Sequence, residues 1–347
     1  MPSQIFRWPV PDLDWYRIRS EFLVTNASSY AVGDLVAQAG SQVRGNCLAN
    51  LGTSTVALPL VITHGSAPGP VLAITAGIHG GEYVPMVAAR EFVRDLDPAL
   101  MRGTIVVCLQ SSPVAFQQRV AFVNPLDGKN LNRSFPGDPS GGPTQRLAAW
   151  LWENLLARAD YYIDCHCGDL PEALDPFTGV SPGPDGVVDE RARAMADCFD
   201  VPRLIVDPLE GSTIRAAALA GIPAVLIEVG GEGRWSQQEA DVQRHGLRRA
   251  AAQVGILPAE EGARPHLPLF EDAANVLSEH PGLWYPEVAP GALVTEGTRL
   301  GRLEDPLGDV VQEILAPTDG VLVFGLSSLA AVEGSLLALI ARPLPTT

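Results

Sequence analysis

Apolar, β-branched runs alternate with stretches of helical periodicity along most of the chain, and this alternation predicts an α/β fold. The clearest example begins at residues 71–76, where an apolar run predicts a buried strand. Residues 84–96 then place apolar side chains near helical spacing, and residues 104–109 form another apolar run. Strand, helix and strand in this order predict two parallel neighbours in one sheet, with the helix packed on a face.

The whole pattern predicts about six or more strands in a mixed, mainly parallel sheet flanked by helices. Residues 236–239, SQQE, match a capping box and mark the start of the last helix. Residues 65–70 indicate a turn, and residues 110–143 a long irregular segment of the kind that tends to be functional. The other predicted elements are strands at 44–51, 56–63, 160–167, 203–206 and 224–229, a further strand near Val180, and helices at 15–22, 145–157, 187–199 and 212–220.

The sequence changes character near residue 265. From residue 266 onward, short β-like pieces are separated by turns, so we expect an α/β domain at 1–265 and a small all-β domain at 266–347. The pattern PGALVTEGTRLGRL followed by ILAPTDGVLV resembles the barrel-sandwich fold of lipoyl and biotinyl domains. A carrier domain of that type needs a lysine at its hairpin tip. Because Lys129 is the only lysine in the chain, the resemblance implies this fold without lipoylation.

Composition and charge narrow the class of protein. Hydrophobic residues make up 46% of the chain without an apolar run near 18 residues in length, which favours a soluble protein. The N-terminal sequence lacks an export signal and the five cysteines are odd in number, so we expect reduced thiols and a cytoplasmic location. The net charge of −16 disfavours nucleic acid and anionic membranes as partners, because both are bound mainly through Lys and Arg.

A candidate metal site follows the strand predicted at 71–76. The loop AGIHGGE carries His79 and Glu82, and its glycines let the backbone fold tightly enough for both side chains to reach one cation. Both are ordinary zinc ligands, although a His and a Glu at a strand end more often have no chemical role. His166 is the best candidate for a third ligand, because it also ends a predicted strand and strand ends gather at one edge of such sheets. Asp164, two residues earlier, is a candidate to orient that imidazole.

A catalytic zinc site needs more than its ligands. Three protein ligands leave a fourth position for water, so we expect one zinc ion per chain and a base that takes a proton from that water. Glu228 ends the apolar strand at 224–229, where an unpaired carboxylate is costly to bury, and is the first candidate for the base. An ion pair with an arginine is the more ordinary explanation of such a carboxylate. Glu232 ranks second because its surroundings are more polar.

Four motifs, taken in order, resemble the succinylglutamate desuccinylase/aspartoacylase family, which is related to zinc carboxypeptidases. They are GIHGGE, NLNRSFPG, the strand ending DCHC and the strand ending IEVGG. The pattern FQQRV followed by NPLDGKNLNRSFPGD is most similar to the branch that contains N-acetyl-diaminobutyrate deacetylases. The resemblance extends over roughly residues 71–250 and includes the C-terminal β module. It implies a zinc carboxypeptidase-like fold for the α/β domain, which would be the catalytic one.

The resemblance also implies roles for single residues. The three candidate ligands would bind zinc, and Glu228 would be the general base and acid. Arg119 would polarise the scissile carbonyl, while Asn132 and Arg133 would hold a substrate carboxylate, which a guanidinium can grip through two parallel hydrogen bonds. Without the motifs, ion pairs with some of the forty acidic residues would be the preferred interpretation of both arginines.

Together these features predict a zinc-dependent amidohydrolase that removes an N-acyl group, acetyl or similar, by attack of zinc-bound water. The expected partner is a small N-acylated amino acid, and assembly into a homo-oligomer stays open. One alternative is a zinc carboxypeptidase acting on short peptides. Another is a carboxylate-binding or assembly protein with a vestigial metal site. A thiol mechanism through Cys165 or Cys167 is less favoured, because alternation along a strand places both on the face opposite His166.

Overall fold

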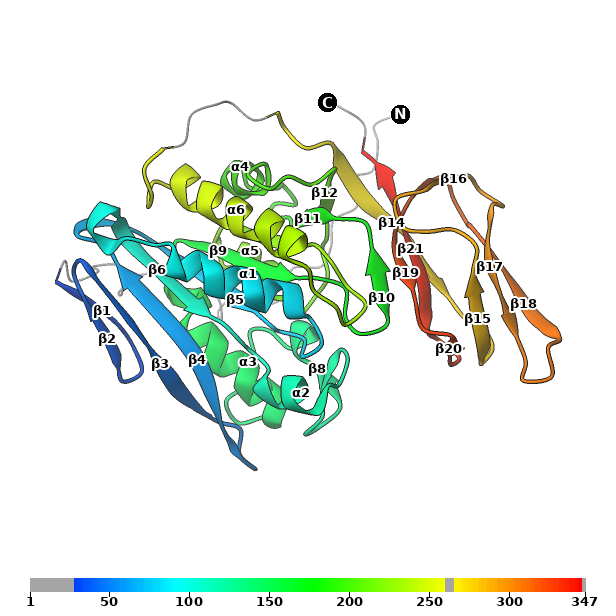
Figure 1. Ribbon diagram of the computed structural model, residues 1–347, viewed down its shortest axis with the longest axis horizontal. Coiled ribbons are helices and arrows are strands. Elements are labelled where there is room, and N and C mark those ends of the chain that lie inside the picture. The colour runs from blue at the N-terminus through cyan, green and yellow to red at the C-terminus, as the bar shows by residue number, and fades with distance from the viewer. Residues whose placement is uncertain (1–27, 260–264, 345–347) are drawn as a thin grey trace.

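The computed structural model describes residues 28–259 and 265–344, so the predicted helix at 15–22 lies outside the described residues. A large twisted sheet runs through the molecule with helices on both faces (Figure 1). None of the described helices combines the length and apolar character needed to cross a bilayer. These helices are α1 (Tyr83–Arg94), α2 (Pro113–Gln118), α3 (Pro143–Asn154), α4 (Glu190–Ala196), α5 (Thr213–Leu219) and α6 (Gln237–Gln253).

Most of the described strands belong to one sheet. Across it they follow the order β10 (Glu172–Leu174), β19 (Gly320–Leu326), β21 (Leu336–Pro343), β14 (Leu269–Leu277), β12 (Leu204–Val206), β11 (Phe177–Val180), β13 (Ala224–Glu228), β9 (Tyr161–His166), β5 (Ala67–Ala76), β6 (Arg102–Cys108), β4 (Thr55–His64) and β3 (Ser41–Asn50), with β16 (Leu293–Val294) beside β19. Smaller sheets contain β1 (Ser29–Val32) with β2 (Leu35–Gln38), β7 (Val123–Asn124) with β8 (Lys129–Asn130), and, in spatial order, β18 (Val310–Leu315), β17 (Arg299–Glu304), β15 (Gly282–Pro286) and β20 (Ala330–Ala331).

The centre of the large sheet is parallel. β5 pairs in parallel with β6 on one side and with β9 on the other, and β13 follows β9 in the same direction. Antiparallel strands flank this group, with β4 against β6 and β11 against β13. The predicted mixed sheet flanked by helices is therefore confirmed, with its parallel pairs mostly at the centre and antiparallel pairs toward both edges.

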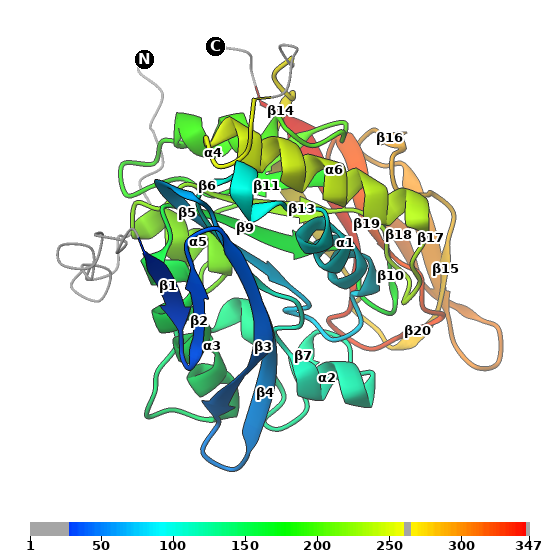
Figure 2. The same cartoon turned by 60° about the vertical axis from the view of Figure 1, so that its left-hand side comes forward.

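Two apolar cores lie on opposite faces of this sheet. In β5, Val71 and Ala73 belong to one core, and Leu72 and Ile74 belong to the other. Helices α3 and α5 contribute to the first core, and α1, α4 and α6 to the second. Figure 2 shows α1 and α6 side by side on their face. Because helices cover both faces, consecutive strand residues are all buried, which explains the unbroken apolar runs of the sequence.

Two local predictions are wrong. Residues 65–70 are not a free turn, because β5 begins at Ala67, which pairs with Arg102. Gly69 permits this approach, since a Cβ there would lie 2.7 Å from the carbonyl carbon of Arg102. Residues 110–143 are not irregular throughout, because they contain α2 and the hairpin of β7 and β8. Periodicity missed these elements because each is too short to repeat an apolar pattern.

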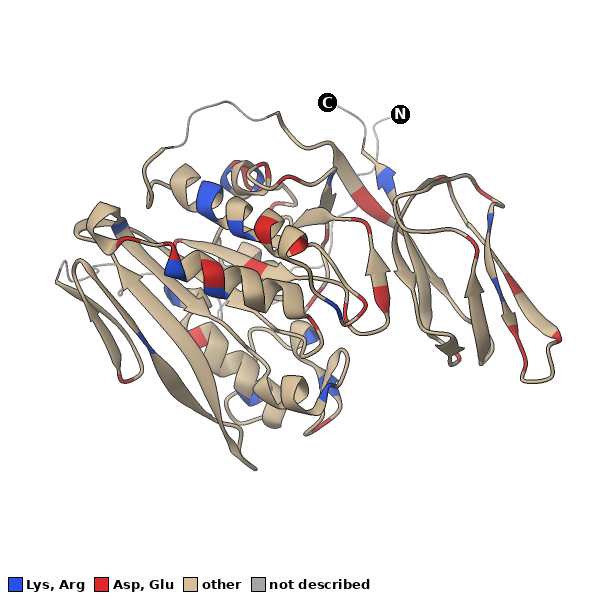
Figure 3. Ribbon diagram, viewed as in Figure 1, with Lys and Arg blue, Asp and Glu red and all other residues tan. Residues whose placement is uncertain are grey.

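The C-terminal strands enclose a core that includes Trp284, Leu303 and Leu337. Their antiparallel sheets agree with the predicted β module, and acidic side chains outnumber basic ones along them (Figure 3). β14 nevertheless pairs in parallel with β12, so the large sheet continues from the N-terminal part into the C-terminal part. The division into domains at 1–265 and 266–347 stays a prediction.

Candidate functional site

Three neighbouring parallel strands deliver the predicted site residues to one edge of the sheet. After β5 the chain turns through Gly77, whose φ of +66° favours glycine, and reaches His79. Glu82 then occupies the N-cap position of α1. The next strand, β9, ends at His166, which is in register with Glu228 at the end of β13. Topology alone therefore brings together residues that are far apart in the sequence.

Glu82 is the centre of the candidate metal-ligating group, which is His79, Glu82 and His166. Its Oε1 lies 2.6 Å from Nδ1 of His79, and its Oε2 lies 2.9 Å from Nδ1 of His166. One ligand atom from each residue can be chosen so that all lie within 4.8 Å of one another. Glu82 and His166 are 2% and 1% exposed. Two imidazole nitrogens and a carboxylate that converge in this way are the donor set of a catalytic zinc site.

The other nitrogen of each imidazole contacts a fixed oxygen. Nε2 of His166 lies 2.9 Å from Oδ2 of Asp164, and Nε2 of His79 lies 3.0 Å from Oδ1 of Asn130. If each Nε2 carries the proton and donates it to its oxygen, both Nδ1 atoms are free to bind a cation. Outward hydrogen bonds of this kind hold metal-ligating imidazoles in position. This observation fits the residues to zinc independently of the sequence motifs.

Asp164 is itself held by hydroxyl groups from two elements. Thr75 of β5 donates to its Oδ1 at 2.6 Å, and Thr213 at the start of α5 donates to its Oδ2 at 2.5 Å. The carboxylate is fully buried, so these bonds and the imidazole of His166 replace the water it would otherwise bind. The structure thus places Asp164 where it can orient His166, as the sequence suggested.

Electrostatics within the group follow from burial and close approach. Burial alone would raise the pKa of Glu82, but the imidazoles of His166 and His79 outweigh it and lower this pKa to about 2. Burial opposes the charge on His166, yet Asp164 and Glu82 raise its pKa well above the ordinary value. The carboxylates therefore favour positive charge at this place. A divalent cation bound to the two Nδ1 atoms would supply that charge and displace the protons.

Glu228 differs from Glu82 and Asp164, because among the described residues it forms no hydrogen bond or ion pair with an imidazole. Its Oε2 is buried and accepts no hydrogen bond, and within the described ranges it forms no ion pair with an arginine. Burial raises the pKa of Glu228 well above its ordinary value, against the effect of His166 and with help from Glu82. A carboxyl group with a raised pKa is suited to exchange protons near neutral pH.

Glu232 lies in a different setting. It is paired with the exposed Arg234, and it lines a hollow of about 450 Å³ together with Trp235. This hollow begins just beyond the strand that carries Glu228. Because its charge is already matched by a flexible surface arginine, Glu232 remains the weaker candidate for a base.

The remaining predicted residues occupy the segment after β6. Asn132 is buried, and its amide oxygen accepts a hydrogen bond of 2.9 Å from the backbone N–H of Thr213. The guanidinium of Arg133 donates to the carbonyl of Asn132 at 2.7 Å. Arg119 ends α2 with an exposed side chain. In the described part of the chain neither arginine forms an ion pair, so both guanidinium groups are available to a ligand.

Sequence reasoning missed Asn130 and Gln243. Asn130 precedes a short helical turn at Leu131–Arg133, and its Oδ1 also accepts from the N–H of Asn132, so it links that turn to His79. Its position in the NLNR motif is the signal that could have identified it. Gln243 of α6 donates to the carbonyl of His166 at 2.7 Å, and nothing in a helical pattern identifies such a contact.

The thiols of the site are not activated. Burial raises the pKa of both Cys165 and Cys167 well above the ordinary value for cysteine. A nucleophilic cysteine requires the opposite shift. The thiol mechanism therefore has no support in this geometry.

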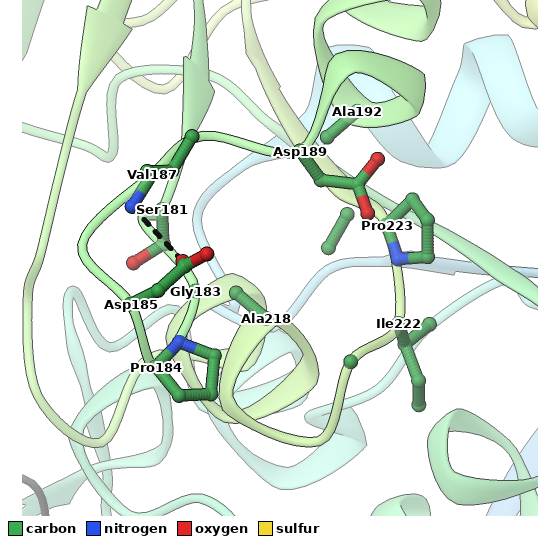
Figure 4. A pocket seen from close by; sticks show the side chains of 12 residues that line it. Ser181, Gly183, Pro184, Asp185, Val187, Asp189, Ala192, Ala218, Ile222 and Pro223 are labelled. Atoms are coloured by element: carbon green, nitrogen blue, oxygen red, sulfur yellow. Dashed lines mark hydrogen bonds between the residues drawn. The ribbon is translucent and has the colours of Figure 1, made fainter.

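A separate cavity of about 370 Å³ lies at the other end of β13 (Figure 4). Pro223 and Ala224, where that strand begins, are among its lining residues, whereas Glu228 ends the same strand. The hydroxyl of Ser181 in its wall is buried and has no hydrogen-bond partner. The cavity thus belongs to the sheet edge opposite the candidate metal-ligating group.

Comparisons with known proteins identify the family of the chain. Residues 68–254 match the succinylglutamate desuccinylase/aspartoacylase catalytic domain, which is more than half of the chain. The chain belongs to the succinylglutamate desuccinylase/aspartoacylase family. The match spans His79, Glu82, His166 and Glu228, and membership makes the chain a hydrolase that acts on linear amides, as expected.

Individual members of the family resemble the chain over most of its length. The N-alpha-acetyl-L-2,4-diaminobutyric acid deacetylase of Halomonas elongata is 28% identical over 284 residues, which are 79% of this chain and 82% of that protein. A crystal structure of a family member from Rhodobacter sphaeroides has a TM-score of 0.78 at 25% identity, covering 88% of this chain and 96% of its own. The product-bound ectoine utilization protein EutE (DoeB) of Ruegeria pomeroyi also reaches 0.78 at 25% identity, covering 87% and 95%. The predicted family, and its resemblance to the diaminobutyrate deacetylases, are confirmed.

Proposed function

We propose that this chain is a zinc-dependent amidohydrolase that removes an N-acyl group, acetyl or similar, from a small amino-acid-like substrate. His79, Glu82 and His166 would hold one zinc ion per chain. The observation that carries the proposal is the meeting of one nitrogen from each imidazole and a carboxylate oxygen within 4.8 Å, beside Glu228, whose buried Oε2 accepts no hydrogen bond. The deacetylase of Halomonas elongata acts, by its name, on an N-acetylated diamino acid, which supports a substrate of this class.

The division of labour between the two carboxylates follows from their surroundings. Zinc at this site would lower the pKa of water to roughly 7 and polarise the amide carbonyl. Glu82 has a lowered pKa and stays ionised, as a ligand must. Glu228 has a raised pKa and can accept a proton from the attacking water and deliver it to the departing amine. One group thus serves as base and then as acid.

Binding of the substrate falls to the segment after β6. Arg133 and the amide of Asn132 would hold the substrate carboxylate, with the guanidinium free to form two parallel hydrogen bonds. Arg119 would donate to the oxygen on which negative charge develops. Because Asn130 precedes the turn that carries Asn132 and also contacts His79, the carboxylate-binding group is tied to the metal site.

The decisive experiment compares the wild-type chain with Glu228→Gln. We expect the variant to bind about one zinc ion per chain and to lose turnover by roughly 10²–10⁴-fold, because an amide cannot take up the proton. Metal content measured by elemental analysis separates this effect from loss of zinc. Full activity in Glu228→Gln would remove the residue from the mechanism. A wild-type chain that neither binds zinc nor cleaves any substrate would instead favour a carboxylate-binding or assembly protein.

A panel of substrates separates the two enzymatic alternatives. N-acetyl, N-succinyl and other N-acyl amino acids are compared with dipeptides, using the zinc-loaded protein and kcat/KM as the measure. The proposal expects faster hydrolysis of the N-acyl amino acids. Preference for dipeptides would identify a carboxypeptidase acting on short peptides.

A further inference from the structure

The carboxylate of Asp169 is buried completely and connects segments that surround the metal-ligating group. It lies three residues after His166, and both of its oxygens accept backbone hydrogen bonds. Oδ2 accepts from the N–H of Phe122 at 2.7 Å, and Oδ1 accepts from the N–H of Leu170 at 2.7 Å. A buried carboxylate whose two oxygens are occupied in this way is fixed in one position.

The segment that Asp169 contacts is the one that carries Arg119. Arg119 has a φ of 55° and Phe122 a φ of 62°, so two of the three non-glycine residues with left-handed backbone in the described chain bracket this short segment. That conformation costs free energy for a residue with a side chain and persists only where other contacts enforce it. The N–H of Arg119 bonds within the end of α2, to the carbonyl of Phe116, whereas the N–H of Phe122 bonds to Asp169.

Asp169 also packs against the turn between the first two candidate ligands. A Cβ at Gly81 would lie only 1.9 Å from Oδ1 of Asp169, so only glycine fits between His79 and Glu82 at this point. The backbone N–H of Asp169 in turn donates to Oε2 of Glu172 at 2.7 Å. The carboxylate therefore lies between the metal-binding turn, the strand end of His166 and the segment of Arg119.

Asp169 is not placed as a metal ligand, because its oxygens face backbone N–H groups and it is absent from the converging group. We propose that Asp169 is a positioning residue, which sets the place of Arg119 relative to the metal-binding turn by holding the backbone at Phe122. This inference rests on the proposed function, in which Arg119 stabilises negative charge on the substrate oxygen. It explains why an acidic residue is buried beside other carboxylates without a cationic partner of its own.

The first test measures how strongly backbone amide hydrogens are protected from exchange, a quantity that does not depend on turnover. Asp169→Ala and Asp169→Asn are compared with the wild-type chain by hydrogen–deuterium exchange of peptides that contain residues 119–122. We expect faster exchange of the Phe122 amide in Asp169→Ala and a smaller increase in Asp169→Asn, whose side-chain oxygen still accepts one hydrogen bond. Asp305→Ala is the matched control, because Asp305 also accepts two backbone N–H groups, from Leu307 and Asp309, far along the chain from this site. Unchanged exchange at 119–122 in Asp169→Ala overturns the proposal.

The second test is a double-mutant cycle with Arg119→Ala, measured as kcat/KM on the best substrate of the panel. Removal of a donor to the substrate oxygen costs about 10²–10³-fold, and we expect Asp169→Ala to lose about tenfold or more with zinc content unchanged. In the Arg119→Ala background, the Asp169 substitution should cause little further loss, because both act through the same guanidinium. Losses that multiply, or loss of zinc in Asp169→Ala, would show a merely structural role. If Asp169→Ala does not fold, the same double-mutant cycle is measured with Asp169→Asn and Arg119→Ala, and the same criteria apply.

Discussion

Two of the regions that contain paired charges, the surroundings of His166 and the C-terminal sheet, differ in how far they are exposed. Around His166 the carboxylates of Glu82 and Asp164 are 2% and 0% exposed, and each contacts fixed partners from other elements. On the C-terminal sheet, Arg299 of β17 contacts Glu287 and Glu313, and these side chains are 43%, 35% and 59% exposed. Figure 3 shows charged residues spread along these strands. Ion pairs are present in both regions, but only the buried ones must be satisfied by the protein itself.

The comparison teaches why buried and exposed charges should respond differently to substitution. At the exposed strands, water and salt screen each charge, and long side chains lose conformational freedom when they pair. At the strand ends of β5 and β9, Glu82, Asp164 and His166 are almost entirely removed from bulk solvent, so a misplaced or unmatched charge is costly. We therefore expect substitutions in the buried group to change metal binding and activity strongly, and substitutions at the surface to change little.

The largest effect is expected for Glu82→Ala. This change removes the carboxylate that faces the Nδ1 atoms of both imidazoles. A zinc ion would then have two protein ligands instead of three. We expect zinc to be lost on mild dialysis and activity to vanish with it, as measured by elemental analysis and turnover. Glu279→Ala removes an exposed acid from the C-terminal part and serves as the control. Retention of stoichiometric zinc in Glu82→Ala would remove Glu82 from the ligand set.

A smaller loss is expected for Asp164→Asn. The amide keeps a similar shape but carries no charge, so it holds the imidazole of His166 less firmly and makes its Nδ1 a poorer donor. We expect the affinity for zinc to fall by about 10–100-fold, measured by competition with a chelator. An affinity equal to that of the wild-type chain would contradict the orienting role of Asp164.

The effect of burial on the pKa of Glu172 can be tested by measuring how stability depends on pH. Burial raises the pKa of Glu172 to about 7, above its ordinary value, so the folded chain binds a proton there more tightly than the unfolded chain. Stability attributable to this group is then present at low pH and lost as the pH rises from about 4.5 through 7. Chemical denaturation at several pH values should show that Glu172→Gln removes this loss, which amounts to at most about 3 kcal/mol. Parallel pH profiles of the two proteins would contradict the raised pKa.

The smallest effect is expected at the surface. Arg299→Ala breaks the exposed pairs with Glu287 and Glu313, and we expect a thermal midpoint and a kcat/KM that cannot be distinguished from those of the wild-type chain. Differential scanning calorimetry at low and high salt checks this. A clear loss of stability that disappears at high salt would show that the exposed pairs act as a network.

The sequence predicts the chain segments of the site better than the contacts between them. Apolar runs locate β5, β9 and β13, and their order gives the shared edge at which His79, His166 and Glu228 meet. Asn130 and Asp169 are different, because each acts through a hydrogen bond to a residue about fifty positions away, and no local pattern encodes such a pair. The short elements between residues 110 and 143 cannot be predicted for a similar reason, because tertiary contacts stabilise them and they are too short to show an apolar period.

The parallel pairing of β12 with β14 has a consequence for any attempt to dissect the chain. A fragment that stops at residue 265 would leave the N–H and C=O groups of β12 without neighbours on one side and would uncover Ile205, which now packs with Phe270. An exposed edge strand of this kind can form hydrogen bonds with strands of other molecules. We expect such a fragment to precipitate or self-associate during purification. The C-terminal strands therefore protect the N-terminal part of the chain from aggregation.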